Sequence, residues 1–332
     1  MQWNKGYSAE FYAEILDPIT WEGIKRIEII GGTIDRTTEG LLESASIKLK
    51  ENIEEKWIRI WMNTRQEDSG SHEPLFTGLI SIPERTLIGS REEYVADCFS
   101  VLKPAEDILL DRGYYAPANI QVGSIIKSLL WQCPSPFKCS NKITLKNPII
   151  AEESETALSM INKILKVANS KLIISGKGEI EMVSSNETEI KVTFEPVIND
   201  VIELNIKDKK DWYKCPNVFR AVMNGLVAVA KDESKGKLSI SSRNREIWME
   251  ETDCNLSNGE SLTEYAMRRL AEEQKIGREL NYTRRYDPRI KPGNLIRMNY
   301  PAQNLFGCFK VKNQTVEIGH NCKTNEASEE VI

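Results

Sequence analysis

The chain has 332 residues, of which 40% are hydrophobic and 28% charged, and its formal net charge is -5. The length predicts two or three globular domains, and the mildly acidic charge argues against specific binding to nucleic acid, which needs a basic surface. No apolar run approaches the roughly 20 residues of a membrane span. No apolar segment follows the first residues either, so neither a membrane segment nor a secretory signal peptide is expected.

Seven cysteines are scattered along the chain without a CxxC pair. An odd number at irregular spacing predicts free, mostly buried thiols in a reducing compartment rather than a disulfide framework. Zinc sites need clustered cysteine and histidine ligands, and the chain has only two histidines. We therefore expect no metal and no other cofactor.

The first hundred residues are rich in short β-prone segments. Residues 57–62, 75–82 and 94–101 are predicted strands, and the second of these stops at Pro83. Residues 66–73 are polar and predict an exposed loop. Short strands separated by Gly, Pro, Asn and Ser favour a β-barrel or a β-sandwich.

The middle of the chain has a different character, which begins near residue 101. Apolar residues between 122 and 130 recur at helical spacing, and a loop rich in Pro, Cys and Ser is expected at 133–140. A second helix is expected after Ser154, which can cap it. Residues 172–183 predict a β-hairpin that turns at 176–178. The second helix has the apolar stripe Ala157, Ile161, Ile164, Leu165 and Ala168.

Strands are expected again from residue 196. Ile202, Leu204 and Ile206 alternate with polar residues, as in a half-buried strand. The apolar run at 217–231 is interrupted by Asn224-Gly225, a dipeptide that favours a hairpin turn.

One helix interrupts this C-terminal region. Ser261 and Glu264 have the spacing of a capping box, in which each side chain bonds a backbone amide at the helix start. The helix is predicted to span 261–276, and Gly277 can adopt the left-handed conformation that ends it. Strands follow at 294–300, 307–312 and 314–318, and the polar tail at 321–332 is expected to be frayed.

Residues with catalytic chemistry are scarce. His72 lies in the predicted polar loop and His320 at the end of the last predicted strand, and neither has an evident nucleophile beside it. No Gly-rich phosphate motif is present. Paired carboxylates, as a glycoside hydrolase would need, are interpreted as solvated faces because acidic residues are abundant. The pairs considered are Asp107 with Asp111, Glu152 with Glu153, and Glu250 with Glu251.

Two groups of residues are candidates for contacts with other proteins. Arg284, Arg285 and Arg289 form the densest basic cluster, with Lys291 nearby. They could meet an acidic partner or could lie in a charged turn. Trp57 and Trp61 lie on one face of their predicted strand. Since tryptophan is enriched at protein interfaces, they could contact a second subunit, although core packing is the alternative.

One stretch resembles a known family. Residues 286–311 contain Pro292-Gly293-Asn294, then an alternating strand, a turn, and Gly307-x-Phe309-x-Val311. This is similar to the closing barrel of the baseplate hub proteins of contractile phage tails, of the prophage or tail-like bacteriocin type. Leu75 to Ile80, with its Phe-Thr-Gly step, resembles a strand of the first barrel of these hubs.

The resemblance implies a mainly β fold with an α+β insertion, in which two tail-tube-like β-barrels flank a small mixed α/β domain. The implied domains are a first β-barrel at 1–101, the mixed α/β insertion at 102–195, a second β-barrel at 196–320 with the helix 261–276, and the polar tail at 321–332.

The same resemblance implies a structural function without enzymatic activity. The chain would be a homotrimer that adapts the hexameric tail tube protein to the central spike. Other baseplate proteins and a tape measure protein are further implied partners, and DNA would be present only in transit through the lumen. The location would be the virion tail baseplate or a tail-like particle, assembled in the host bacterial cytoplasm.

Two other functions remain open from the sequence. One is a tail-associated cell-wall hydrolase, which would need a compact site of paired acids. The other is a carbohydrate- or receptor-binding β-module that uses the tryptophans. Turnover of peptidoglycan would favour the first, and glycan binding by the isolated chain would favour the second.

Overall fold

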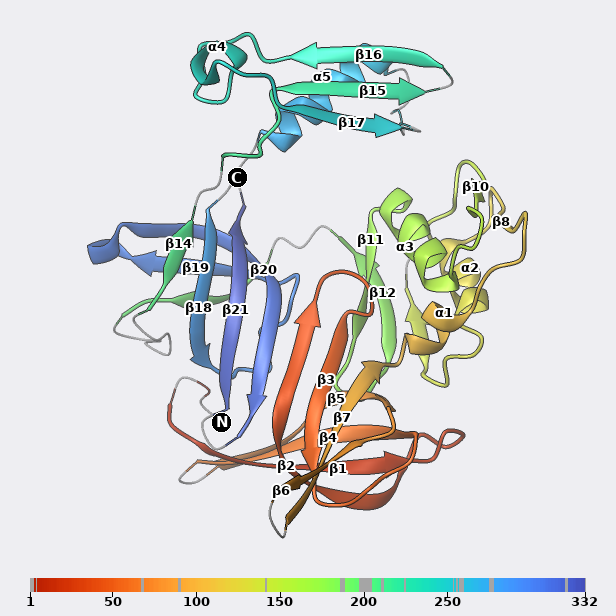
Figure 1. The fold of residues 1–332 in the computed structure, drawn as a ribbon, viewed down its shortest axis with the longest axis vertical. Coiled ribbons are helices and arrows are strands. Elements are labelled where there is room, and N and C mark those ends of the chain that lie inside the picture. Colours follow the sequence, from red (N-terminus) through yellow and green to blue (C-terminus); the bar gives the residue numbers. More distant parts are fainter. Residues whose placement is uncertain are drawn as a thin grey trace. The chain divides into compact units, whose positions relative to one another are not determined.

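The computed structural model describes residues 3, 5–66, 69–88, 91–140, 142–185, 189–196, 205–209, 212–223, 225–252, 254, 256, 260–274, 278–319 and 322–331. The fold is mainly β with few helices, as the sequence predicts (Figure 1). No helix in these ranges is long and apolar enough to cross a membrane. The chain divides into two compact units, one of Met1–Ile206 with Asn281–Ser328, the other of Lys207–Leu280 with Glu329–Ile332.

The N-terminal strands of the first unit form a ring of pairings. Their bounds are β1 (Ser8–Leu16), β2 (Gly23–Thr37), β3 (Glu43–Leu49), β4 (Lys56–Gln66), β5 (Ser69–Ile80), β6 (Glu84–Ile88) and β7 (Arg91–Ser100). The path β1-β4-β5-β7-β3-β2 returns to its start because β1 also pairs with β2, and β6 pairs with β7. Ile34, Ile47, Ile60 and Phe76 have no exposed surface and belong to the core of these strands.

Burial along these strands follows the alternation of the sequence. In β4, Ile58, Ile60 and Met62 are fully buried, as the strand predicted at 57–62 requires. The prediction of a loop at 66–73 is wrong for the residues of this segment that the structure describes. Backbone pairing of β4 with β5 continues outward to Gln66 and Ser69, so the polar composition belongs to an exposed end of a hairpin.

The C-terminal strands of the first unit continue the same sheet. They are β13 (Ile190–Phe194), β18 (Glu279–Arg285), β19 (Leu295–Tyr300), β20 (Leu305–Ile318) and β21 (Lys323–Glu330), and a short 3-10 helix, η1 (Pro301–Gln303), precedes β20. The order runs β2-β20-β21-β18, and β19 pairs with both β20 and β13. The strands expected at 307–312 and 314–318 are one strand.

The prediction of a frayed tail is wrong for residues 323–330. This segment is β21, which lies between β20 and β18. Thr324, Glu326 and Ser328 are buried there, and two of them meet polar groups of neighbouring strands. Glu326 accepts a hydrogen bond of 2.8 Å from Arg284, and the Tyr282 hydroxyl lies 3.1 Å from the Ser328 hydroxyl. A buried polar face has no apolar alternation, which explains why the sequence pattern suggests no strand.

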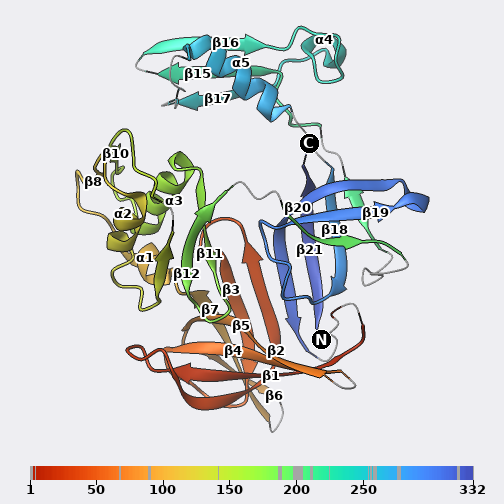
Figure 2. The same cartoon turned by 180° about the vertical axis from the view of Figure 1, so that it is seen from behind.

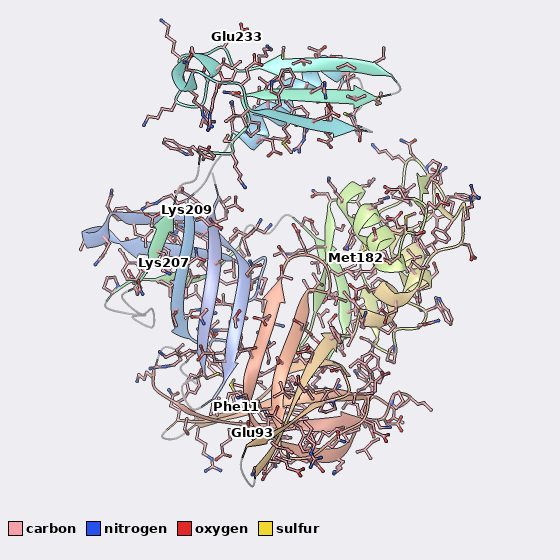
Figure 3. The ribbon with its side chains drawn as sticks, in the orientation of Figure 1. Phe11, Glu93, Met182, Lys207, Lys209 and Glu233 are labelled. Carbon is pink, nitrogen blue, oxygen red and sulfur yellow. The ribbon has the colours of Figure 1, made fainter. Side chains whose placement is uncertain are left out.

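The mixed segment contains the expected helices and hairpin. Its elements are α1 (Lys103–Asp107), β8 (Tyr115–Ala116), α2 (Val122–Leu129), β9 (Phe137–Cys139), β10 (Ile149–Ile150), α3 (Ala157–Val167), β11 (Ser170–Ile174) and β12 (Ile180–Ser184). The loop expected at 133–140 contains β9, which pairs with β12. Met182 of β12 is fully buried in the core shared with the helices (Figure 3).

The cap of α3 differs from the expectation. Ser154 has a φ of 61°, and the side chain of Thr156 instead accepts the hydrogen bond from the Ser159 amide. Thr156 has extended backbone, as an N-cap residue requires, whereas the left-handed conformation of Ser154 places it outside the helix.

The turn of the β11–β12 hairpin contacts the N-terminal strands. The Gly176 carbonyl accepts a hydrogen bond of 2.8 Å from the Thr77 hydroxyl, and the Lys177 carbonyl accepts one of 3.0 Å from the Trp21 indole. A Cβ atom on Gly176 would lie 1.8 Å from the Pro74 carbonyl oxygen, so only glycine allows this approach.

The second unit contains a three-stranded sheet and one long helix. Its elements are β14 (Lys207–Lys209), β15 (Val218–Met223), β16 (Leu226–Lys231), α4 (Ile240–Arg243), β17 (Trp248–Thr252) and α5 (Leu262–Glu273), and Figure 3 labels Lys207 and Lys209 of β14. The strand order is β16-β15-β17. The hairpin expected at 217–231 is confirmed as β15 and β16, and so is the capping box of Ser261 and Glu264.

Three expectations lie outside the described residues. These are the strand residues Ile202 and Leu204, the turn residue Asn224, and the helix-ending Gly277. The domain boundaries expected after residues 101 and 195, and the second barrel at 196–320, stay predictions.

Candidate interaction surfaces

The basic cluster does not form a single surface patch. In β18, Tyr282 and Arg284 point inward, and Arg284 is 1% exposed. Its Nε donates a hydrogen bond of 2.8 Å to Glu326 on β21. Burial alone lowers the pKa of the Arg284 guanidinium, but the Glu326 carboxylate outweighs burial and the net shift is upward. Arg284 therefore stabilises the interior of the sheet and is not at the surface.

The other members of the cluster remain accessible. Arg289 is exposed and pairs with Asp287, to which its Nε donates a hydrogen bond of 3.0 Å. Arg285 is half-buried, and its guanidinium lies 6.0 Å from the centre of the Tyr7 ring. A contact of Arg285 or Arg289 with a partner stays a prediction.

Trp57 and Trp61 have different surroundings within the chain. Trp57 is half-buried and packs against the core of the mixed segment, with its ring centre 5.5 Å from that of Trp21. Trp61 is half-buried, stacks on His72 at 4.2 Å and donates a hydrogen bond of 2.7 Å from its indole to Glu14. Their use at a subunit interface stays a prediction.

His72 belongs to a strand of the β4–β5 hairpin. Its Nε2 lies 2.9 Å from the Tyr12 hydroxyl, so its polar partner is the Tyr12 phenol. His320 lies outside the described residues.

Each of the three acidic pairs considered for hydrolysis contains at least one residue engaged in an ion pair. The partners are Lys103 for Asp107, Lys163 for Glu152, Arg220 for Glu250 and Arg269 for Glu251. Among the described residues, no three His, Cys, Asp or Glu side chains are grouped so that they could hold a metal ion. All seven cysteines are free thiols, and five of them are buried.

In the second unit, the face of the β16-β15-β17 sheet that does not contact α5 is partly apolar. Helix α5 packs on one face of the β16-β15-β17 sheet, where Phe219, Ala221 and Ala230 are buried. On strands β16 and β17, Val227 is 59% exposed, Val229 41% and Trp248 50%. β16 and β17 are also the two outer strands of this sheet. Exposed apolar side chains on an outer strand are typical of a surface that another protein covers.

A groove of about 470 Å³ lies within the first unit. One wall is the β11-β12-β9 sheet, and the other is formed by the β2–β3 connection and the turn at 291–294. Figure 1 and Figure 2 show β11 beside the β2–β3 connection from opposite sides. The sequence does not indicate this groove, because its walls come from segments that are far apart in the chain.

The floor of the groove has a buried charged cluster. The Nε of Arg36 lies 3.8 Å from Oε2 of Glu43, and both side chains are 6% exposed. Burial raises the pKa of Glu43 to about 7, although Arg36 and Lys291 lower it. Within the described residues, Oε1 of Glu43 has no hydrogen-bond partner.

No protein-family model and no curated protein matches the chain. Solved structures do match it. A tail protein from Neisseria meningitidis MC58 is similar with a TM-score of 0.72 and 13% identity, over 98% of this chain and 97% of that one. A 43 kDa tail protein of prophage MuSo2 from Shewanella oneidensis has a TM-score of 0.70 and 13% identity, over 97% and 98%.

A component of the type VI secretion system of E. coli, described as structurally similar to the T4 bacteriophage tail proteins gp27 and gp5, is a more distant match. It has a TM-score of 0.52 and 10% identity, over 96% of this chain and 77% of that one. The family resemblance drawn from the sequence is thus confirmed in structure, and the chain has the fold of these phage tail proteins.

Proposed function

We propose that the chain is a structural component of a phage-tail or tail-like baseplate, and that it acts as a trimeric hub between a hexameric tail tube protein and a central spike. The observation that supports this proposal is the likeness in fold to two tail proteins over 97% or more of every chain compared. Partners in the proposal also include other baseplate proteins, with a tape measure protein and DNA inside the ring. No catalytic activity is part of this role.

We assign one subunit contact to the uncovered face of the β16-β15-β17 sheet. An outer strand with exposed Val227 and Val229 can pair with a strand of a neighbouring copy, which would remove both its unpaired backbone groups and its apolar surface from water. A head-to-tail contact that repeats around a threefold axis closes a ring of three copies. The proposed hub needs such a ring because it would join a sixfold tail tube to a threefold spike.

The test is the mass of the full chain in solution, measured by light scattering with and without the tail tube and spike proteins of the same particle. We expect three copies per complex. A chain that stays monomeric with both partners present contradicts the hub function.

Two variants locate the contact. Val227→Lys and Val229→Lys should each prevent trimer formation, because a charge would be buried at the interface. Met267→Lys on α5 is the matched control, since Met267 is also 59% exposed but lies on the helix. If the variants on β16 assemble as the control does, the contact lies elsewhere.

A further inference from the structure

The groove of the first unit has along one wall a strand edge that pairs with no further strand among the described residues. Strand β11 is the outer strand of the β11-β12-β9 sheet, and five consecutive residues, 171–175, line the groove. The side chains of Leu172 and Ile174 are buried in the core on the opposite face. These two residues therefore offer backbone groups to the groove rather than side chains.

The hydrogen-bond pattern shows which backbone groups point into the groove. In an antiparallel pair, only alternate residues bond across the two strands. The Ile180 amide bonds to the Pro136 carbonyl on the far side, so Ile180 and its partner Ile174 form a non-bonded pair. The Ile174 carbonyl accordingly faces the groove, where Lys291 donates to it at 3.4 Å. Leu172, two residues earlier, has the same orientation by alternation.

Both charged and apolar side chains line the groove beside this edge. The cationic lining residues are Arg36, Lys138, Lys171, Lys191 and Lys291, against the carboxylates Glu43, Glu179 and Glu181. The lining thus has an excess of two positive charges. Ile173 and Val183 add apolar surface on the outer face of the sheet, with Leu42 and Pro292 also lining the groove.

We propose that this groove binds an extended, acidic peptide segment of another protein, which adds as a strand along β11. Backbone bonds to Leu172 and to the amide of Ile174 supply affinity, and the groove's cations select acidic side chains over basic ones. This inference concerns a different surface from the β16 contact and does not depend on the hub function.

The test uses a capped seven-residue peptide of alternating Val and Glu, added to the full chain. Hydrogen–deuterium exchange followed by mass spectrometry reports on the amides of residues 170–175. At a peptide concentration ten times the Kd, we expect exchange of the Leu172 and Ile174 amides to slow by about ten-fold.

Two peptide controls separate strand addition from simple charge attraction. A peptide of alternating Val and Lys should bind at least ten-fold more weakly, because the groove is cationic. The Val and Glu peptide, N-methylated at every residue, keeps its charges but loses its N–H groups, and it should no longer protect residues 170–175.

Variants of the chain place the site. Lys171→Gln should weaken binding of the Val and Glu peptide by about three- to ten-fold, as expected for one partly screened charge contact. Lys127→Gln, an exposed lysine on α2, is the control and should bind as the parent does. Absence of binding at about 1 mM peptide, equal binding of the N-methylated peptide, or binding without protection of 170–175 would overturn the proposal.

Discussion

Arg284 on β18 and Glu326 on β21 form an ion pair in which neither side chain has any exposed surface. Glu326 also accepts a hydrogen bond of 2.7 Å from Gln314, which in turn accepts one of 2.7 Å from Arg36 on β2. Polar contacts thus connect an N-terminal strand to three C-terminal strands through the interior of the first unit.

Removing one partner of this ion pair should destabilise the folded chain. Arg284→Met leaves the Glu326 carboxylate buried without its cation, and we expect the free energy of unfolding to fall by about 3–5 kcal/mol. The measurement is urea-induced unfolding followed by tryptophan fluorescence. The double variant Arg284→Met with Glu326→Met should lose less than the single variant, because no charge is then left unpaired. A single variant as stable as the parent contradicts this role.

The Gly176 turn gives a second prediction. In Gly176→Ala the new Cβ would have to displace the Pro74 carbonyl, which belongs to the paired strand β5. We expect a loss of about 1–3 kcal/mol in the free energy of unfolding. Gly6→Ala is the control because nothing lies within 4 Å of its Cβ position. Equal effects of the two substitutions would show that the contact at Gly176 is not tight.

Glu43 should make stability depend on pH. Its pKa rises from 4.5 to about 7 on folding, chiefly because of burial, while Arg36 and Lys291 oppose this rise. Between pH 4.5 and 7 the Glu43 carboxyl is therefore protonated in the folded chain and ionised in the unfolded chain. The free energy of unfolding consequently falls as the pH rises through this window. Glu43→Gln cannot ionise. The melting temperature of this variant, relative to the parent, should increase from pH 5 to pH 8, and a constant difference contradicts the shift.

Thiol accessibility should distinguish two groups of cysteines. Cys139 and Cys308 are half-buried, whereas the other five are buried. Burial raises the pKa of Cys133 to about 11 and that of Cys322 to about 12, so these two are also poorly ionised at neutral pH. We expect a maleimide to label Cys139 and Cys308 first, and all seven in denaturant, with sites read by mass spectrometry. Early labelling of Cys133 or Cys322 would contradict the burial of these thiols.

Local features of the fold could be predicted from the sequence. The β11–β12 and β15–β16 hairpins, the helix at 122–129 and the capping box at Ser261 depend on residues close together in the chain. Apolar periodicity and turn chemistry specify such elements directly.

Features that depend on distant partners could not be predicted in this way. β21 contains Glu326 and Ser328 at buried positions, and partners on β18 and β20 make burial of these groups favourable. For the same reason Arg284, read as part of a basic cluster, is an interior residue. The groove beside β11 has no sequence signature either, since it is created where separate segments meet.

The pairing of β2 with β20 also has a consequence for the order of folding. Arg36 and Gln314, bonded across these neighbouring strands, are 278 residues apart in the sequence. During synthesis β2 emerges from the ribosome long before β20, so one of its edges stays open while most of the chain is made. At about 5–20 residues per second this interval lasts roughly 15–60 s. A nascent chain in this state exposes an unpaired strand to other nascent copies, and chaperones that shield such edges should raise the yield of folded protein.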